Sequence, residues 1–94
     1  MTLNFDWNKE KAKVNYKKHG VSFIEAATVF SDPFAVTCYD SLHSIEEDRF
    51  MTLGYSDGYR LLVVVHTERN YNTRIISART ATSQERSIYA QNQS

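Results

Sequence analysis

The sequence predicts a single α+β domain, residues 1–94, in which an antiparallel β-sheet is flanked by two helices near the N-terminus and one at the C-terminus. Residues 49–79 contain apolar, strand-like segments separated by turn signals, which is typical of a meander. Residues 8–30 and 82–90 instead carry helix caps and helix stops. A chain of 94 residues, 41% hydrophobic and 13% aromatic, suffices for one core and is not disordered in character.

The first 20 residues predict a short strand followed by a helix. Residues 3–7 alternate between apolar and polar side chains, as a half-buried strand does. Asp6 or Asn8 can cap the helix, because either side chain accepts hydrogen bonds from the free amides of a first turn. We expect the helix to end near His19, where basic residues precede Gly20.

A second, short helix is expected from Ser22 to about Phe30. Ser22 and Glu25 have the spacing of a capping box, in which the serine accepts from the amide three residues on and the glutamate reaches back. Pro33 closes this segment, because proline cannot continue the helical hydrogen bonds.

The rest of the chain predicts four strands and a final helix, so that the order is β-α-α-β-β-β-β-α. The expected strands are residues 34–39, 49–55, 59–67 and 73–79, and the helix is residues 82–90, opened by a second capping box. Asp57-Gly58 signals a two-residue hairpin turn, and residues 68–72 form the next loop. Residues 61–65 are apolar at every position, which predicts a central strand covered on both faces.

The formal charge is zero, yet the charges are unevenly distributed. Residues 1–20 hold all five lysines, residues 21–48 hold six acids and no lysine or arginine, and residues 49–94 hold all six arginines. A neutral total argues against strong non-specific binding of nucleic acid. The two basic segments can still build a local site for an anion, and the acidic middle can meet a basic partner.

Cysteine and histidine usage argues against disulfides and metal sites. Cys38 is the only cysteine, which we expect to be a small residue within a strand, and it fits a reducing, cytoplasmic compartment. His19 and His43 lack the spacing of metal ligands, so no metal or cofactor is predicted. No segment has the character of a signal peptide or of a membrane span.

Hairpin geometry predicts a row of three basic side chains. A two-residue turn at residues 57–58 pairs Arg49 with His66, and a loop over residues 68–72 pairs His66 with Arg74. These three side chains then share one face of the sheet, while Arg79 lies on the opposite face. A single bulge would move residues of either strand to the other face.

An arginine–histidine–arginine row suits an anionic ligand. Guanidinium groups bind phosphate oxygens in a fork, and an imidazole titrates near neutral pH. The alternative is that Arg49 and Arg74 only form ion pairs with nearby acids such as Glu47 and Glu68.

Several segments resemble one known family. They are residues 5–7, 18–23, 25–27, 29–33, 48–54, 61–67, 74–79, 85–86 and 89. The most specific are the strings Lys-His-Gly-Val-Ser-Phe at residues 18–23 and Arg-Ile-Ile-Ser-Ala-Arg at residues 74–79. Together they span nearly the whole chain, and they resemble the BrnT family of toxins, whose fold is similar to that of RelE-type messenger-RNA endonucleases.

The resemblance implies a cytoplasmic ribonuclease toxin of a type II toxin–antitoxin system, which cleaves RNA and inhibits translation. It implies a partner similar to BrnA, an antitoxin with a ribbon-helix-helix domain, and operator DNA bound only through the complex. The resemblance also implies an RNA substrate that the ribosome can present. RelE-like enzymes use the 2′-hydroxyl of the RNA itself, so the resemblance implies no metal or cofactor.

The candidate site residues follow from the residue types and from this resemblance. The catalytic candidates are Arg79, Arg74, His66, Arg49, Glu47 and Tyr89, and the RNA-binding candidates are Lys17, Lys18 and Arg60. Arginines stabilise charge on a phosphorane, and His66 is the group best suited to general acid–base work. By the resemblance, Arg79 and Tyr89 occupy the places of a phosphate-stabilising arginine and a C-terminal tyrosine. Alternatively, Tyr89 only packs its ring in the core, and Lys18 is only a helix-terminal charge.

Two other functions are compatible with the neutral charge of the chain. The first is a non-catalytic, partner-binding module that acts only in an operon-repressing complex. The second is a small scaffold-like domain without a nucleic-acid role.

Overall fold

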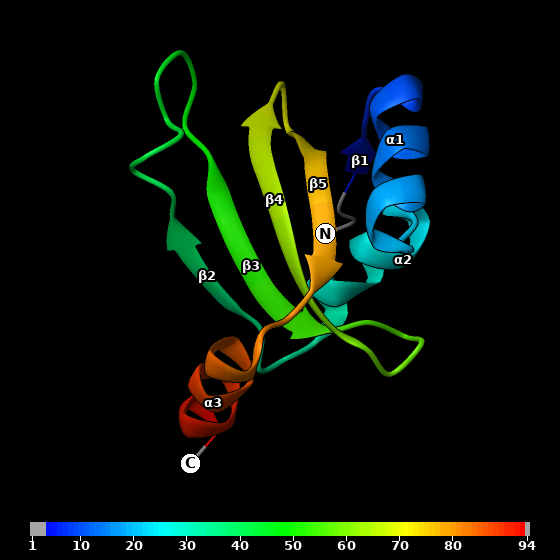
Figure 1. Ribbon diagram of the computed structural model, residues 1–94. Helices are drawn as coiled ribbons and strands as arrows, with labels where there is room; N and C mark the ends of the chain where they lie inside the picture. The colour runs from blue at the N-terminus through cyan, green and yellow to red at the C-terminus, as the bar shows by residue number, and fades with distance from the viewer. Residues whose placement is uncertain (1–3, 94) are drawn as a thin grey trace.

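The computed structural model describes residues 4–93 and shows a five-stranded sheet with three α-helices (Figure 1). In chain order the elements are β1 (Asn4–Asp6), α1 (Lys9–His19), α2 (Phe23–Thr28), the 3-10 helix η1 (Val29–Ser31), β2 (Val36–Tyr39), β3 (Phe50–Tyr55), β4 (Leu61–Arg69), β5 (Asn72–Thr80) and α3 (Ser83–Asn92). The α+β class is confirmed. Within residues 4–93 no helix has the length and apolar character needed to cross a membrane.

The sheet is mixed, so the prediction of a wholly antiparallel sheet is wrong at one edge. The strand order is β1-β5-β4-β3-β2, and β1 pairs with β5 in parallel, with Asp6 opposite Arg74. The other pairs are antiparallel. Tight turns impose an antiparallel arrangement only on consecutive strands, and β1 is separated from β5 by most of the chain. The first residue of the strand predicted at residues 3–7 lies outside the described residues.

The ends of the first two helices lie at the signals that the sequence carries. Asn8 caps α1, because its Oδ1 accepts from the amide of Lys11 at 3.0 Å. Gly20 follows α1 with φ +69°, a left-handed conformation that glycine adopts without strain. Ser22 caps α2 through the amide of Glu25 at 3.0 Å. The predicted capping box is incomplete, since the Glu25 carboxylate binds the β3–β4 loop instead of reaching back.

β4 is the central strand and is buried from both sides, as its unbroken apolar run predicts. On one face a core cluster contains Val21, Phe23, Ala26, Val29, Leu62, Val64, Ile75 and Ala78. On the other face Leu53, Leu61 and Val63 pack against Tyr89 of α3. We call the first the α2 face and the second the open face, because α3 covers only part of it and Met51, Val65 and Ser77 remain partly exposed there.

Both β-hairpins differ from their predicted form. The β3–β4 loop has three residues, 57–59, because the amide of Ser56 donates to the carbonyl of Arg60 at 2.9 Å. Its last residue adopts a φ of 61°. The β4–β5 turn has only Asn70 and Tyr71, with φ values of 48° and 69°, and both strands are therefore longer than predicted. Each change moves the strand pairing by one residue.

β5 also contains a bulge. Val65 pairs with Ser77, whereas the next residue, His66, pairs with Ile75. Ile76 is therefore an extra residue without a partner on β4, and the side chains of β5 exchange faces across it.

Asn15 of α1 completes the edge of β5 where β1 is too short to do so. β1 reaches only as far as Arg74 on β5. Further along, the Asn15 Oδ1 accepts from the amide of Ala78 at 3.1 Å, and its Nδ2 donates to the carbonyls of Ala78 at 2.9 Å and Val21 at 3.1 Å. A buried helical side chain thus replaces the missing strand and fixes α1 beside the sheet.

We predict that Asn15→Ala lowers the free energy of unfolding by about 2–4 kcal/mol, because it leaves buried backbone groups without partners. Urea denaturation measures this change. Lys13→Ala is the matched control on α1, since the side chain of Lys13 is 77% exposed. A loss no larger for Asn15→Ala than for Lys13→Ala would contradict the proposed role of Asn15.

Candidate active site

The open face carries Arg49, Arg74 and Arg79, whereas His66 points to the α2 face. The predicted row of Arg49, His66 and Arg74 is wrong, because Phe50 and not Arg49 pairs with His66, and Ile75 and not Arg74 lies opposite it. The placement of Arg79 on the opposite face from Arg74 is also wrong. The bulge in β5 reverses the parity between these two arginines and brings them to the same face.

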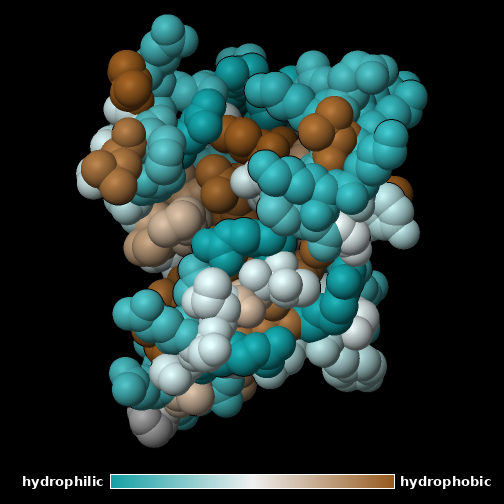
Figure 2. Space-filling model, in the orientation of Figure 1, coloured by the Kyte–Doolittle hydropathy of each residue, from teal (hydrophilic) through white to brown (hydrophobic). Residues whose placement is uncertain are grey.

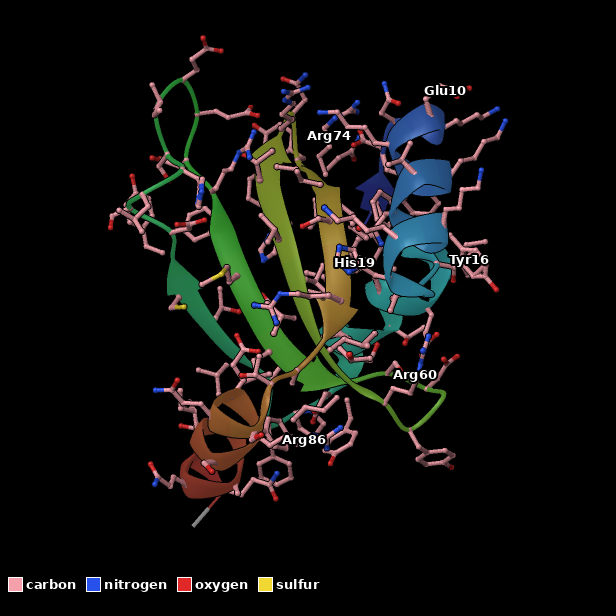
Figure 3. All side chains as sticks on the ribbon, in the orientation of Figure 1. Glu10, Tyr16, His19, Arg60, Arg74 and Arg86 are labelled. Atoms are coloured by element: carbon pink, nitrogen blue, oxygen red, sulfur yellow. The ribbon has the colours of Figure 1, made fainter. Side chains whose placement is uncertain are left out.

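A polar cleft of about 110 Å³ lies beside the start of α1, where β3 and β5 begin and β4 ends. Its lining residues are Asn8, Lys11, Glu47, Arg49, Arg69, Arg74, Ile75 and Ile76, and we call it the arginine cleft. Figure 3 shows Arg74 at this end of the sheet, next to the start of α1. In Figure 2 this end of the molecule is mainly hydrophilic, with a few hydrophobic residues exposed among the hydrophilic ones.

The cleft has more positive than negative groups, and Arg49 is left without a counter-ion. Arg69 donates to both carboxylate oxygens of Glu47, at 3.1 and 3.0 Å. Arg74 donates to Asp6 at 3.2 Å. The Nε of Arg49 is buried and has no hydrogen-bond partner among the described residues. A buried donor of this kind is costly unless an acceptor reaches it, so the cleft suits an anionic ligand.

Lys11 adds a further cation to the arginine cleft. It is exposed, and no ion pair of its ammonium is seen in the part of the chain that the structure describes. The sequence left open that Arg49 and Arg74 only form ion pairs with nearby acids. Arg74 does form such a pair, with Asp6 and not with Glu68, whereas Arg49 forms none among residues 4–93.

His66 is a core residue on the α2 face. Its ring lies between Phe30 and Phe50, with centroids 4.9 and 5.9 Å away. Its Nε2 lies 2.7 Å from the hydroxyl of Thr52, which in turn lies 2.8 Å from that of Thr37. Burial lowers the pKa of His66 to about 4, so the ring is neutral near pH 7. Nothing in this geometry brings the imidazole to the arginine cleft.

Arg79 is held by α3. Its guanidinium donates to the two carboxylate oxygens of Glu85, at 2.8 and 2.9 Å. Glu85 also closes the capping box with Thr82, as predicted. The bond from Arg79 lowers the pKa of Glu85 to about 2, and the two groups form a stable link between β5 and the start of α3. Arg79 thus lies on the same open face as the cleft, but the carboxylate of Glu85 neutralises its charge.

Tyr89 fixes the other end of α3. Its hydroxyl donates to Asp32 at 2.5 Å, and its ring packs edge-on against Tyr55. Burial and the contact with Asp32 raise the pKa of Tyr89 to about 12. Tyr89 therefore packs its ring in the core, which was the alternative to a catalytic role for this residue.

The three predicted RNA-binding residues lie in different places. Arg60 donates to Glu25 and to the carbonyl of Gly20, and its contact lowers the pKa of Glu25. It therefore ties the β3–β4 loop to α2. Lys17 and Lys18 are both exposed, but they line different grooves on the two sides of α1.

Sequence reasoning missed three polar residues of the arginine cleft, namely Asn8, Lys11 and Arg69, and the two isoleucines that line it. Arg69 fell in a segment assigned to a loop, although an Asn-Tyr pair can form the two-residue turn that extends β4 to this residue. Asn8 and Lys11 reach the cleft only because β1 is parallel to β5. Among residues 4–93, no three histidine, cysteine, aspartate or glutamate side chains converge in a way that could hold a metal ion.

The buried state of His66 predicts how stability depends on pH. Because its pKa is lower in the folded than in the unfolded state, only the unfolded chain takes up this proton between about pH 6.5 and 4, and stability falls as the pH falls through this range. Between pH 7 and pH 5 we expect the wild type to lose about 2 kcal/mol more than His66→Gln, measured by urea denaturation.

His19→Gln serves as the control for this experiment, because His19 is exposed at the end of α1 and forms no ion pair within residues 4–93. It should keep the pH dependence of the wild type. Parallel profiles for the wild type and His66→Gln would show that the imidazole is not buried in its neutral form.

Comparisons with known proteins identify the family. The profile of the family described as "Ribonuclease toxin, BrnT, of type II toxin-antitoxin system" matches residues 7–85. The crystal structure of the Brucella abortus ribonuclease toxin BrnT is similar, with a TM-score of 0.63 and 22% sequence identity over 87% of this chain and 100% of that one. Among curated proteins, none is significantly similar in sequence. The chain belongs to the BrnT family of ribonuclease toxins of type II toxin–antitoxin systems.

Proposed function

We propose that the protein cleaves RNA at the arginine cleft. The gathering of four cations at one cleft carries this proposal: Arg49, which has no carboxylate partner among residues 4–93, lies there with Lys11, Arg69 and Arg74. A phosphodiester is the anionic group that a ribonuclease must hold. Guanidinium groups stabilise it well, since they remain charged and bind oxygens in a fork.

The chemistry that suits these residues is transfer of the phosphoryl group to the neighbouring 2′-hydroxyl. The 2′-oxygen bonds to phosphorus, the bond to the 5′-oxygen breaks, and the products are a cyclic phosphate and a free 5′-hydroxyl. Glu47 is the carboxylate that lines the cleft and serves as the base for the 2′-proton. Lys11 donates a proton to the leaving oxygen, and Arg49 and Arg74 stabilise the phosphorane. This scheme, which resembles RelE-type cleavage of messenger RNA, uses no metal or cofactor.

The remaining catalytic candidates do not contact the phosphate in this proposal. They hold helices and strands in place around the cleft. Arg79 and Tyr89 hold α3 at the lower end of the open face through Glu85 and Asp32. His66 supports the α2 face of β4. We therefore assign these three residues positioning or packing roles.

The family membership implies an antitoxin, and we propose a BrnA-like ribbon-helix-helix protein in this role. Such a partner binds the toxin in the cytoplasm, so that the toxin no longer arrests translation. The complex of the two proteins binds operator DNA. The near-neutral charge favours RNA that is presented at high local concentration, for example on the ribosome, since free RNA is only weakly attracted. The second candidate, a partner-binding module without catalysis, is favoured by the ion pairs that engage Arg69, Arg74 and Arg79.

We predict that Arg49→Ala and Arg74→Ala each reduce the rate of RNA cleavage about a hundredfold or more, because each removes a donor to the charged transition state. Purified toxin and a fluorescent oligoribonucleotide provide the assay. Arg86→Ala is the matched control, since Arg86 is exposed on α3, away from the cleft (Figure 3). It should keep the wild-type rate.

Unchanged cleavage in both cleft variants, at equal thermal stability, would contradict the assignment of this site. Absence of cleavage by the wild type, together with retained antitoxin binding, would favour the non-catalytic module instead.

A further inference from the structure

A second groove continues from the arginine cleft along the side of α1. It has a volume of about 350 Å³ and lies between α1 and β5. The lining residues are Glu10, Lys11, Val14, Asn15, Lys18, His19, Ile76 and Ser77, and we call it the α1–β5 groove. Lys11 and Ile76 line both the groove and the arginine cleft, so the two lie next to each other along α1.

The geometry of β5 creates this groove. Ile76 is the bulged residue, so its side chain is available between the sheet and α1 and is only partly buried. The side chain of Asn15 binds the backbone of Ala78, which holds α1 beside β5 along the groove.

The walls of the groove are basic at both ends. Lys11 and Lys18 are seven residues apart on α1, which corresponds to two turns and about 10.5 Å. His19 lies next to Lys18, and Figure 3 shows it at the end of α1 on the side of β5. Glu10 is the one acid of the lining, and it faces Lys13 at 3.9 Å. No ion pair engages Lys11, Lys18 or His19 within residues 4–93.

We propose that the α1–β5 groove binds the RNA strand next to the phosphate that is cleaved. Lys11 lies at the phosphate that is cleaved, Lys18 contacts a backbone phosphate further along the strand, His19 stacks on a base, and Ile76 and Val14 form the apolar surface beneath the bases. This proposal rests on the proposed ribonuclease function and adds to it a path for the substrate. It also separates two neighbouring lysines, because Lys18 lies in the path and Lys17 does not.

Continuity with the cleft favours RNA over an acidic peptide as the occupant. A strand whose phosphate lies among Arg49, Arg69 and Arg74 must leave the cleft, and the groove begins at Lys11, which is shared. Another groove lies between α1 and α2, and none of its lining residues belongs to the cleft; they include Trp7, Lys13, Tyr16, Lys17, Phe23 and Ile24.

The test compares a dinucleotide, which fills only the cleft, with a ten-nucleotide RNA, which also fills the groove. The variant Lys18→Ala/His19→Ala removes two groups of the groove. The matched control, Lys13→Ala/Lys17→Ala, removes two cations from the other side of the same helix. Cleavage is measured as kcat/KM, and binding is measured with a ten-nucleotide RNA that carries 2′-O-methyl groups and cannot be cleaved.

We expect Lys18→Ala/His19→Ala to lower kcat/KM for the ten-nucleotide RNA about tenfold or more and to leave the dinucleotide rate unchanged, which also shows that the variant is folded. The slope of log Kd against log salt for the 2′-O-methyl RNA should fall by about 0.7, because one phosphate contact is lost. The control should change neither substrate.

The proposal is overturned if the groove variant cleaves and binds the ten-nucleotide RNA like the wild type, or if the control loses as much as the groove variant. It is also overturned if the groove variant loses only binding of polyglutamate, which would identify an acidic peptide as the occupant. If the wild type cleaves neither substrate but the groove variant weakens binding of the 2′-O-methyl RNA, then the groove is supported and the ribonuclease function fails.

Discussion

The bulge at Ile76 determines which side chains of this protein can act together. Without it, Arg74 and Arg79 would lie on opposite faces of β5, since their positions differ by an odd number. With it, both lie on the open face, and Ile75 joins the core on the other side. The same extra residue places Ile76 between β5 and α1, where it lines both the cleft and the groove. One irregular residue in the sheet therefore places Arg74 and Arg79 on one face and Ile76 against α1.

The fold resolves the contrast between a neutral chain and an anionic substrate by neutralising most arginines locally. Arg60, Arg69 and Arg79 each donate two hydrogen bonds to one carboxylate, and such pairs stabilise structure without creating a strong long-range field. Arg74 forms a further ion pair with Asp6, whereas no ion pair engages Arg49 in the cleft or Arg86 on α3 within residues 4–93. The arginines that have a carboxylate partner contribute little to a long-range field, which limits non-specific attraction to nucleic acid.

The sequence was sufficient to predict the helices and strands, but it was not sufficient to predict which residues of neighbouring strands pair. The caps at Asn8 and Ser22, the stop at Gly20 and the apolar run of β4 act locally or through burial, so their patterns are visible in the chain. The left-handed Tyr59 and the bulge at Ile76 carry no such pattern, because neither is a residue type that favours these conformations. Each shifts the pairing by one residue, and a shift of one residue exchanges the faces of a strand. The three-residue loop that ends at Tyr59 separates His66 from Arg49, and the two-residue turn at Asn70-Tyr71 separates it from Arg74, so His66 lies in the core and not at the predicted site.

The parallel strand β1 explains why the two basic segments of the chain meet. The lysines lie in the first 20 residues and the arginines in the second half, so only tertiary structure can combine them. Pairing of Asp6 with Arg74 places the first turn of α1 beside the first residues of β5. Lys11 then lies with Arg49 and Arg74 in the cleft. Asn15 holds the rest of the helix against the same strand. A three-residue strand and one asparagine thus align α1 with the arginines, so a phosphate in the cleft and a strand along α1 would contact cations from both halves of the sequence.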